Sequence, residues 1–210
     1  MTGRAIIVTG TDTNVGKTVF SAALVQALGG AYWKPIQCGL APPLDSERVA
    51  ALAAAGGGRI VPEAYRLQLP RSPHFAAEQE GVTIDPEQLS LPPSDLPLIV
   101  EGAGGALVPI TRRLLFADLF ALWQAPAIVV ARTRLGTISH SLMTIEALRA
   151  RGVPLLGVAF VGDPEEDSEA TIAEIGQVKR LGRLPVLHQV DAVSLGAAFA
   201  AHFRTDDFIR

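Results

Sequence analysis

The sequence predicts a single α/β domain in which helices cover both faces of a mostly parallel sheet. Short apolar stretches alternate with helix-like segments along the chain, which is the pattern of repeated βαβ units. The chain has 210 residues, of which 49% are hydrophobic, and this is enough for one domain with a substantial core. No repeat or linker divides the sequence, so we expect residues 1–210 to form one domain.

Six apolar stretches are the predicted strands of this sheet. Strands that are buried on both faces consist almost entirely of apolar residues, as Ala127–Ala131 and Leu155–Val161 do. Because ligands of such sheets bind beyond the carboxyl ends of the strands, we expect functional residues at those ends. The predicted strands are Ala5–Thr9, Ala31–Ile36, Leu96–Val100, Ala127–Ala131, Leu155–Val161 and a weaker stretch at Leu184–Val190.

The segments between these strands have the residue spacing of helices. Glycines are expected to end two of them: Gly29-Gly30 ends the helix that follows Thr18, and Gly56-Gly57-Gly58 ends the next one. The segment 70–97 is rich in proline and acidic residues and is expected to be irregular, except for a short helix near Phe75–Glu80. The other predicted helices are Asp45–Ala55, Leu114–Trp123, Ile138–Ala150, Ser168–Leu181 and Ala192–Phe203.

Composition and charge exclude several classes of protein. The net charge is −3 and both signs are spread along the chain, so no basic surface for nucleic acid is expected. No apolar run approaches the length of a membrane span, and the first predicted strand leaves no room for a signal peptide. Cys38 is the single cysteine, which precludes an intramolecular disulfide. We therefore expect a soluble, cytoplasmic protein that binds neither nucleic acid nor membranes.

The segment from Val8 to Thr18, VTGTDTNVGKT, has the features of a phosphate-binding loop. Backbone N–H groups in a glycine-containing loop and at a helix N-terminus bind anionic phosphate. Lys17 would reach the terminal phosphates of a nucleotide, and the Thr18 hydroxyl would bind Mg²⁺. Five residues separate Gly10 from Gly16, one more than in the common motif, and a chance match is the alternative. The strand before the loop and the helix after it favour phosphate binding.

Two charged residues stand at the ends of predicted strands, at the same edge as this loop. Lys34 lies near the end of the second strand, and its alternative role is that of an ordinary solvated lysine. Glu101 directly follows the strand that ends at Val100, and an acidic residue there commonly positions Mg²⁺ in a protein with a phosphate-binding loop. The glycines that follow Glu101 would let the backbone approach a ligand closely, although a flexible turn with an exposed glutamate is the alternative.

Two predicted helix starts add further candidates. Asp45 begins a helix, where an acidic cap needs no function, but beside Thr18 and Glu101 it becomes a candidate third partner of Mg²⁺. The segment 136–139 opens another helix, whose free N–H groups would suit a carboxylate. A plain capped helix remains the alternative at both positions.

With these features in order, the sequence resembles the dethiobiotin synthetase family over nearly its whole length. No single motif carries the resemblance, but their order and spacing agree. The matching motifs are Thr9–Thr18, Lys34-Pro35, Ser72-Pro73-His74, Val100–Gly105 and Leu135–His140. The resemblance implies a three-layer P-loop NTPase fold and a homodimer whose active sites lie near the interface.

The same resemblance implies a reaction that converts 7,8-diaminononanoate, CO₂ and ATP into dethiobiotin, ADP and phosphate with the help of Mg²⁺. The route runs through a carbamate and a carbamic-phosphoric anhydride. Lys17 would hold the β- and γ-phosphates, and Lys34 would stabilise the carbamate and the phosphoryl group in transfer. Thr18, Asp45 and Glu101 would hold Mg²⁺.

The resemblance also implies which residues surround each substrate. The implied nucleotide-binding residues are Asn14, Val15, Gly16, Lys17, Thr18, Val19, Asp45, Glu101, Gly102, Ala103, Gly104, Pro185, Val186 and Leu187. The implied diamine-binding residues are Thr13, Cys38, Gly136, Thr137, Ile138 and Ser139. The last four would come from the partner subunit and hold the carboxylate of the diamine.

Three residues depart from the family pattern. Cys38 stands where the family often has Ser near the substrate amines, and a thiol is the weaker hydrogen-bond donor. Val161 stands where the family often has an Asn that recognises adenine, so base recognition would fall to backbone groups, helped by residues 185–187. Asn14 stands where some members carry an acidic residue near the amine.

Two other functions remain open on the sequence. A partitioning or assembly ATPase of the same fold would carry an early lysine in the loop, but the matching position here is Asp12, and no amphipathic membrane-targeting tail follows. An amidoligase acting on cobyrinic acid would need a glutaminase domain, which these 210 residues do not supply.

Overall fold

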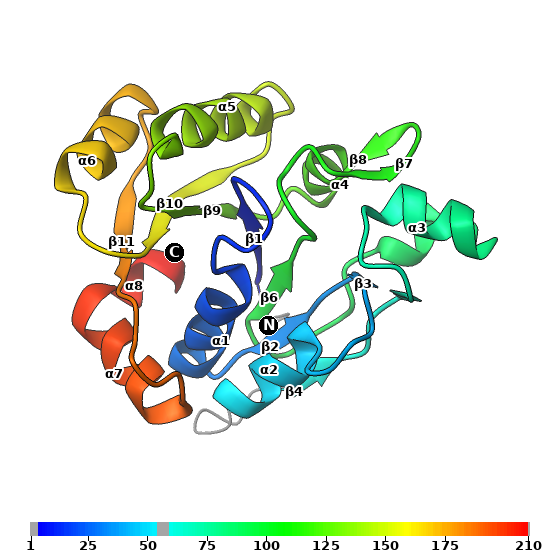
Figure 1. The fold of residues 1–210 in the computed structure, drawn as a ribbon, viewed down its shortest axis with the longest axis horizontal. Coiled ribbons are helices and arrows are strands. Elements are labelled where there is room, and N and C mark those ends of the chain that lie inside the picture. Colours follow the sequence, from blue (N-terminus) through cyan, green and yellow to red (C-terminus); the bar gives the residue numbers. More distant parts are fainter. Residues whose placement is uncertain (1–3, 54–58, 210) are drawn as a thin grey trace.

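The computed structural model describes residues 4–53 and 59–209, which form three layers (Figure 1). The middle layer is a seven-stranded sheet in the order β11-β10-β9-β1-β6-β2-β4, and every pairing between neighbours is parallel. The α/β fold with a mostly parallel sheet is therefore confirmed. The strands are β1 (Ala5–Gly10), β2 (Ala31–Trp33), β4 (Arg59–Val61), β6 (Leu98–Glu101), β9 (Ala127–Arg132), β10 (Leu155–Val161) and β11 (Arg180–Leu184).

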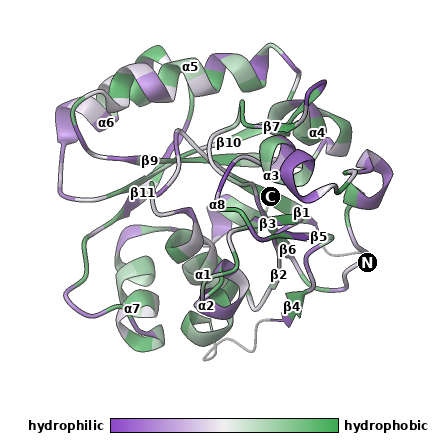
Figure 2. Cartoon of the chain, turned by 45° about the vertical axis from the view of Figure 1, so that its right-hand side comes forward, coloured by the Kyte–Doolittle hydropathy of each residue, from purple (hydrophilic) through white to green (hydrophobic). Residues whose placement is uncertain are grey.

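Helices cover each face of the sheet over a separate hydrophobic core. Successive side chains of a strand point to opposite faces, so Ile7 and Val8 of β1 are both fully buried but belong to different cores. Figure 2 shows helices with both hydrophobic and hydrophilic residues around the sheet. The Val8 face carries α1 (Lys17–Leu28), α2 (Asp45–Leu52), α7 (Ala192–His202) and α8 (Asp206–Ile209), and the Ile7 face carries α4 (Phe116–Trp123), α5 (Thr137–Arg149) and α6 (Glu166–Ile175).

Short elements extend the fold beside the Ile7 face. Strands β3 (Ile36–Cys38) and β5 (Tyr65–Leu67) form a small parallel pair, and β7 (Pro109–Thr111) and β8 (Leu114–Leu115) form an antiparallel one. The mainly irregular segment 70–97 contains the expected short helix as α3 (Pro73–Glu80), together with a 3₁₀ turn, Pro86–Leu89.

The predicted elements differ most from the structure at the β11 edge of the sheet. Helix α6 ends at Ile175, not at Leu181, and the last strand is Arg180–Leu184, not the predicted Leu184–Val190. This strand reads RLGRL, so its apolar pattern is broken by two arginines that form ion pairs with the buried Glu169. Gly182 packs so closely that a Cβ there would lie 2.2 Å from the carbonyl oxygen of His202.

Other boundaries differ by smaller amounts. The predicted strand Ala31–Ile36 is split, because Ala31–Trp33 joins the main sheet whereas Ile36 begins β3 in another. Strand β4 was not predicted. The helix that follows the loop ends as expected at Gly29, which has a left-handed φ of 57°. The expected end at Gly56-Gly57-Gly58 lies outside the described residues.

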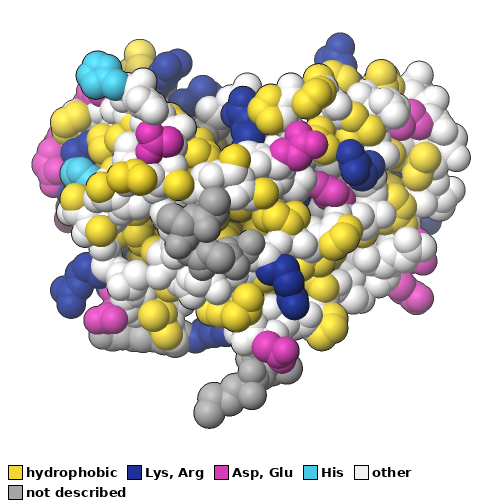
Figure 3. Space-filling view, turned by 90° about the horizontal axis from the view of Figure 1, so that it is seen from below, with side chains coloured by type: hydrophobic (Ala, Val, Ile, Leu, Met, Phe, Trp, Pro, Cys, Tyr) yellow, Lys and Arg dark blue, Asp and Glu magenta, His cyan; other side chains and the backbone are white. Residues whose placement is uncertain are grey.

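The described helices include none that is both long enough and apolar enough to cross a membrane. On the face shown in Figure 3, Lys and Arg side chains are interspersed with Asp and Glu side chains and apolar residues.

Candidate active site

The phosphate-binding loop lies at the carboxyl end of β1, between β6 and β9 in the middle of the sheet. Gly16 is the N-cap residue of α1 and has a φ of 99°, which favours glycine. A Cβ at Gly16 would also lie 2.9 Å from a methyl group of Val161, so a larger residue there would have to displace that side chain. The sequence therefore folds into the strand, loop and helix that phosphate binding requires.

The structure brings most of the predicted phosphate and metal residues together around one cavity of about 300 Å³. They come from the loop, α1, the end of β2, the start of α2 and the end of β6. Arg48 is the one lining residue that the sequence analysis missed. The lining residues are Thr13, Asn14, Gly16, Lys17, Thr18, Val19, Lys34, Asp45, Arg48, Glu101 and Gly104.

Three side-chain oxygens converge at the start of α1. The hydroxyl Oγ1 of Thr18 lies 3.1 Å from Oδ1 of Asp45 and 2.8 Å from Oε1 of Glu101. Carboxylate and hydroxyl oxygens are the ligands that Mg²⁺ prefers, so this set fits the ion. Asp45 is not the helix cap, because Leu44 occupies that position and the Asp45 carboxylate binds side chains instead. The capping interpretation of Asp45 is wrong.

Lys34 supplies the positive charge beside these carboxylates. Its Nζ forms an ion pair with Asp45 and lies 3.6 Å from Oε1 of Glu101. Lys34 is 6% exposed and Glu101 is 1% exposed, so the solvated-lysine and exposed-glutamate interpretations are both wrong. Burial acts to lower the pKa of Lys34, but the charges of Glu101 and Asp45 outweigh burial and raise that pKa above its usual value.

Lys17 is held differently from Lys34. Its Nζ donates to the backbone carbonyl of Asp12 at 2.8 Å, so in this structure the side chain folds back along its own loop. Burial lowers the pKa of Lys17 to about 8, and the charge of Lys34 acts in the same direction. A bound phosphate would favour the charged form of this ammonium group.

Arg132 is a second residue that the sequence analysis missed. It is the last residue of β9, and its Nη2 lies 3.1 Å from Oδ2 of Asp12 in the phosphate loop. The predicted strand stopped one residue short of it, at Ala131. Functional residues tend to follow the carboxyl ends of parallel strands, so a predicted strand that ended at Arg132 would have made this residue a candidate.

A second cavity, of about 400 Å³, lies on the other side of the loop at the end of β10. Val186, one of the predicted nucleotide-binding residues, lines it, and so does Val161. Gly102, Ala103, Pro185 and Leu187 line neither this cavity nor the one around Lys17. The lining residues are Asn14, Val15, Gly16, Arg132, Thr133, Arg134, Val161, Gly162, Asp163 and Val186.

The residues predicted to hold the diamine do not share one cavity. Thr13 lines the cavity around Lys17, whereas Thr137 lines a separate one of about 260 Å³ with Thr11, Arg132 and His140. The Oγ1 atom of Thr137 is buried and has no hydrogen-bond partner among the described residues.

The rest of the predicted diamine set lies around these cavities. Gly136 is the exposed N-cap of α5, with a φ of 91°, and Ser139 is exposed one turn further on. Ile138 packs against the core. Cys38, in β3, is partly exposed, and burial raises the pKa of its thiol to about 11.

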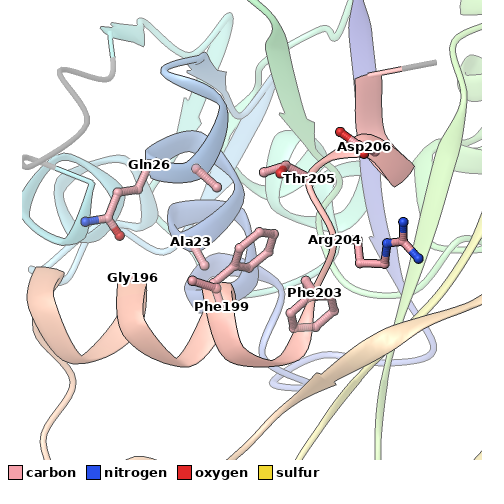
Figure 4. A pocket seen from close by; sticks show the side chains of 10 residues that line it. Ala23, Gln26, Gly196, Phe199, Phe203, Arg204, Thr205 and Asp206 are labelled. Atoms are coloured by element: carbon pink, nitrogen blue, oxygen red, sulfur yellow. The ribbon is translucent and has the colours of Figure 1, made fainter.

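Figure 4 shows a larger cavity, of about 530 Å³, at a different place in the fold. It lies between α1, α7 and the segment after α7, and Phe199 and Phe203 form part of its lining. None of the predicted site residues lines it. We therefore place the candidate active site at the phosphate loop.

Comparison with known proteins assigns the chain to a family. A family model described as "AAA domain" matches residues 4–194. The protein named ATP-dependent dethiobiotin synthetase BioD from Rhizorhabdus wittichii is 61% identical over 98% of this chain and 98% of its own length. The chain belongs to the ATP-dependent dethiobiotin synthetase family. A relative of the same name from Brucella ovis is 58% identical and covers 97% of this chain and 96% of its own.

Solved structures agree with the P-loop fold of this family. A ParA family ATPase from Chlorobium tepidum has a TM-score of 0.60 at 11% identity, and it covers 95% of this chain and 91% of that chain. The MinC:MinD cell division protein complex of Aquifex aeolicus gives 0.56 at 14% identity, with 93% and 86% covered. At such low identity these similarities concern the fold alone. The high-identity relatives therefore decide between a synthetase and a partitioning ATPase.

Proposed function

We propose that the protein forms dethiobiotin, ADP and phosphate from 7,8-diaminononanoate, CO₂ and ATP, as a step of biotin synthesis. One observation in this chain's own structure supports the proposal. Beside the phosphate loop, Lys34 contacts two carboxylates that also contact Thr18. This arrangement offers a site for a metal ion and, next to it, a cation for a transferring phosphoryl group.

In the proposed reaction, one amine of the diamine adds to the carbon of CO₂ and loses a proton, which gives a carbamate. A carbamate oxygen then attacks the γ-phosphorus of ATP, and ADP leaves. The second amine attacks the carbonyl carbon of the resulting anhydride, loses a proton and expels phosphate, which closes the cyclic urea. Such phosphoryl transfer depends mainly on positioning and on charge stabilisation.

The two lysines have separate roles in this proposal. Lys17 leaves the carbonyl of Asp12 and binds the β- and γ-phosphates. Lys34, held by Asp45 and Glu101, directs its ammonium group at the carbamate and the phosphoryl group. Thr18, Asp45 and Glu101 offer the oxygens that would hold Mg²⁺, which when bound neutralises charge on the phosphates.

We further propose that each active site uses two subunits. The N-terminus of α5 offers the N–H groups of Ile138 and Ser139, since that of Thr137 donates to the carbonyl of Arg134 at 2.9 Å, and the unpartnered Oγ1 of Thr137 supplies one more polar group for a carboxylate. Three large apolar residues are exposed near this helix start and near the phosphate loop: Leu107 (50%), Leu135 (108%) and Met143 (54%). Such residues suit a contact between subunits. The compartment we propose is the cytoplasm, whose reducing conditions fit a lone, free Cys38.

The experiment that tests the proposed function follows carbon and phosphate together. Purified protein is given the diamine, MgATP and ¹³C-bicarbonate, and the products are analysed by mass spectrometry. We expect dethiobiotin that carries one heavy carbon, with phosphate released in equal amount and only when the diamine is present. ATP hydrolysis at the same rate without the diamine, with no cyclic urea formed, would defeat the proposal.

A further inference from the structure

Tyr32 is a buried polar residue for which the proposed mechanism has no use. It lies in β2 and is 0% exposed. Its hydroxyl donates a hydrogen bond to Oε2 of Glu101 at 3.0 Å. Tyr32 does not line the cavity around Lys17, so a direct contact with nucleotide is not the reason for this hydroxyl.

The sheet register explains how Tyr32 reaches Glu101. Strand β2 lies beside β6, and Tyr32 is opposite Ile99. Ile99 and Glu101 are two residues apart on one strand, so their side chains share a face, the one that α1 covers. Tyr32 is opposite Ile99, and its side chain is long enough to reach along this face to Glu101, two residues further on.

The two oxygens of Glu101 consequently have different partners. Oε2 accepts from Tyr32, whereas Oε1 lies 2.8 Å from the Thr18 hydroxyl and 3.6 Å from Lys34. These contacts fix the rotation of the carboxylate group and direct one oxygen toward the start of α1. Glu101 is 1% exposed, so water does not readily replace a lost partner.

We propose that Tyr32 is a positioning residue, whose hydroxyl holds the Glu101 carboxylate so that Oε1 faces Thr18 and the metal site. Partners of this kind orient metal-binding carboxylates in many proteins, and their loss typically weakens metal binding. The proposal deepens the proposed function, because it concerns the metal site used with the nucleotide.

The test replaces each of the two tyrosines of the chain by phenylalanine. Binding of Mn²⁺, the probe for Mg²⁺, is measured in the presence of ADP by electron paramagnetic resonance. We expect Tyr32→Phe to weaken Mn²⁺ binding on the order of 10- to 100-fold. Tyr65→Phe is the matched control, because the Tyr65 hydroxyl accepts from the backbone N–H of Asp85 at 2.8 Å and contacts none of the candidate metal ligands. Equal Mn²⁺ affinity in Tyr32→Phe and wild type would overturn the proposal.

A second measurement needs no variant and so does not depend on the folding of Tyr32→Phe. Wild-type protein is labelled with ¹³C at the tyrosine ring carbon that bears the hydroxyl, which gives one signal for each tyrosine. Adding Mg²⁺ to the ADP complex should shift the Tyr32 signal and leave the Tyr65 signal in place. If neither signal moves, or both move alike, Tyr32 has no special link to the metal site.

These measurements separate the inference from the proposed function, because neither of them requires the diamine. Mn²⁺ binding that is weakened in Tyr32→Phe, together with no dethiobiotin formation by the wild type, would support the inference and defeat the proposed function. Dethiobiotin formation by the wild type, together with normal Mn²⁺ binding by Tyr32→Phe, would support the proposed function and overturn the inference.

Discussion

At the scale of single residues, the candidate site depends on one ammonium group beside two carboxylates. Lys34 directly follows β2, whereas its partners Asp45 and Glu101 lie at the start of α2 and the end of β6. The surrounding charges raise the pKa of Lys34 and lower the pKa of Asp45, although burial opposes both shifts. The ion pair therefore persists at neutral pH. Lys34 is then protonated, and its positive charge could stabilise a negatively charged reaction centre.

Replacing Lys34 with Ala removes this charge from a transition state whose negative charge is being redistributed. We expect turnover to fall on the order of a hundredfold or more, equivalent to roughly 3 kcal/mol or more. The measurement is steady-state dethiobiotin formation at saturating substrates. Lys179→Ala is the matched control, since Lys179 is an exposed lysine that pairs with Asp207 away from the site. Near-normal turnover in Lys34→Ala would limit Lys34 to balancing the charge of the carboxylates.

The lowered pKa of Lys17 predicts a pH dependence of nucleotide binding. A free pKa of about 8 means that the ammonium group loses its proton as the pH rises through that value. Phosphates favour the charged form, so ADP binding should take up about one proton near pH 9 and almost none near pH 7. Calorimetry in buffers with different ionisation heats measures this uptake.

Lys17→Arg is the control for this prediction, because a guanidinium stays charged throughout the range and should abolish the proton uptake. Uptake that is equal at both pH values, or that persists in the arginine variant, would assign the proton to another group.

Most residues of the candidate site could be predicted, because each is marked by its immediate neighbours in the sequence. Lys17 and Thr18 lie in a Gly-Lys-Thr sequence between a predicted strand and a predicted helix, which favours a phosphate loop although the glycine spacing is one residue longer than usual. Lys34 and Glu101 lie at strand ends, where functional residues gather. Tyr32 could not be found in this way. A tyrosine inside an apolar strand looks like an ordinary core residue, and its partner lies on another strand far along the chain.

At the scale of elements, the fold could be predicted where a strand is apolar throughout. Strand β10 has the predicted bounds, and β9 is one residue longer than predicted. Strands β4 and β11 could not be predicted. The first has only three residues and lies at the sheet edge, and the second depends on long-range ion pairs with Glu169 in α6. Such tertiary contacts leave no periodic pattern in the sequence.

The end of β10 and the segment after β11 form the apolar part of the second cavity, which predicts weak recognition of the nucleotide base. Val161 and Val186 line it, and neither has a hydrogen-bonding side chain. We expect weaker discrimination between ATP and other nucleoside triphosphates than in a family member with Asn at this position. Competition assays measure the preference, and Val161→Asn should increase it. Strict ATP preference in the wild type would mean that backbone groups or Asp163 recognise the base.

At the scale of the whole molecule, one chain holds two halves of the proposed site in separate cavities. Lys17 lies in one and Thr137 lies in another. A diamine that binds both an activated phosphate and a helix N-terminus must bridge the two halves, either within a chain or between two chains. The exposed Leu107, Leu135 and Met143 favour a contact between chains.

Mixing two inactive variants tests whether sites are shared. Gly136→Val places a bulky residue at a φ of 91° and should weaken diamine binding while ATP binding stays largely intact. Mixed with Lys17→Ala subunits, it should regain activity, because each heterodimer would contain one complete site. A mixture of Lys17→Ala and Lys34→Ala should regain none, since both changes affect the same half. If subunits exchange but no activity returns in the first mixture, the carboxylate is held within one chain.

In the proposed reaction a carbamate oxygen, not water, attacks the γ-phosphorus of ATP. The measurement follows ¹⁸O from labelled CO₂ in ordinary water, within seconds of mixing and before the label exchanges with the solvent. We expect each released phosphate to carry one ¹⁸O and each dethiobiotin to retain one ¹⁸O in its urea carbonyl. Unlabelled phosphate released together with labelled dethiobiotin would contradict the proposed reaction, because the oxygen that attacked phosphorus would then have come from water.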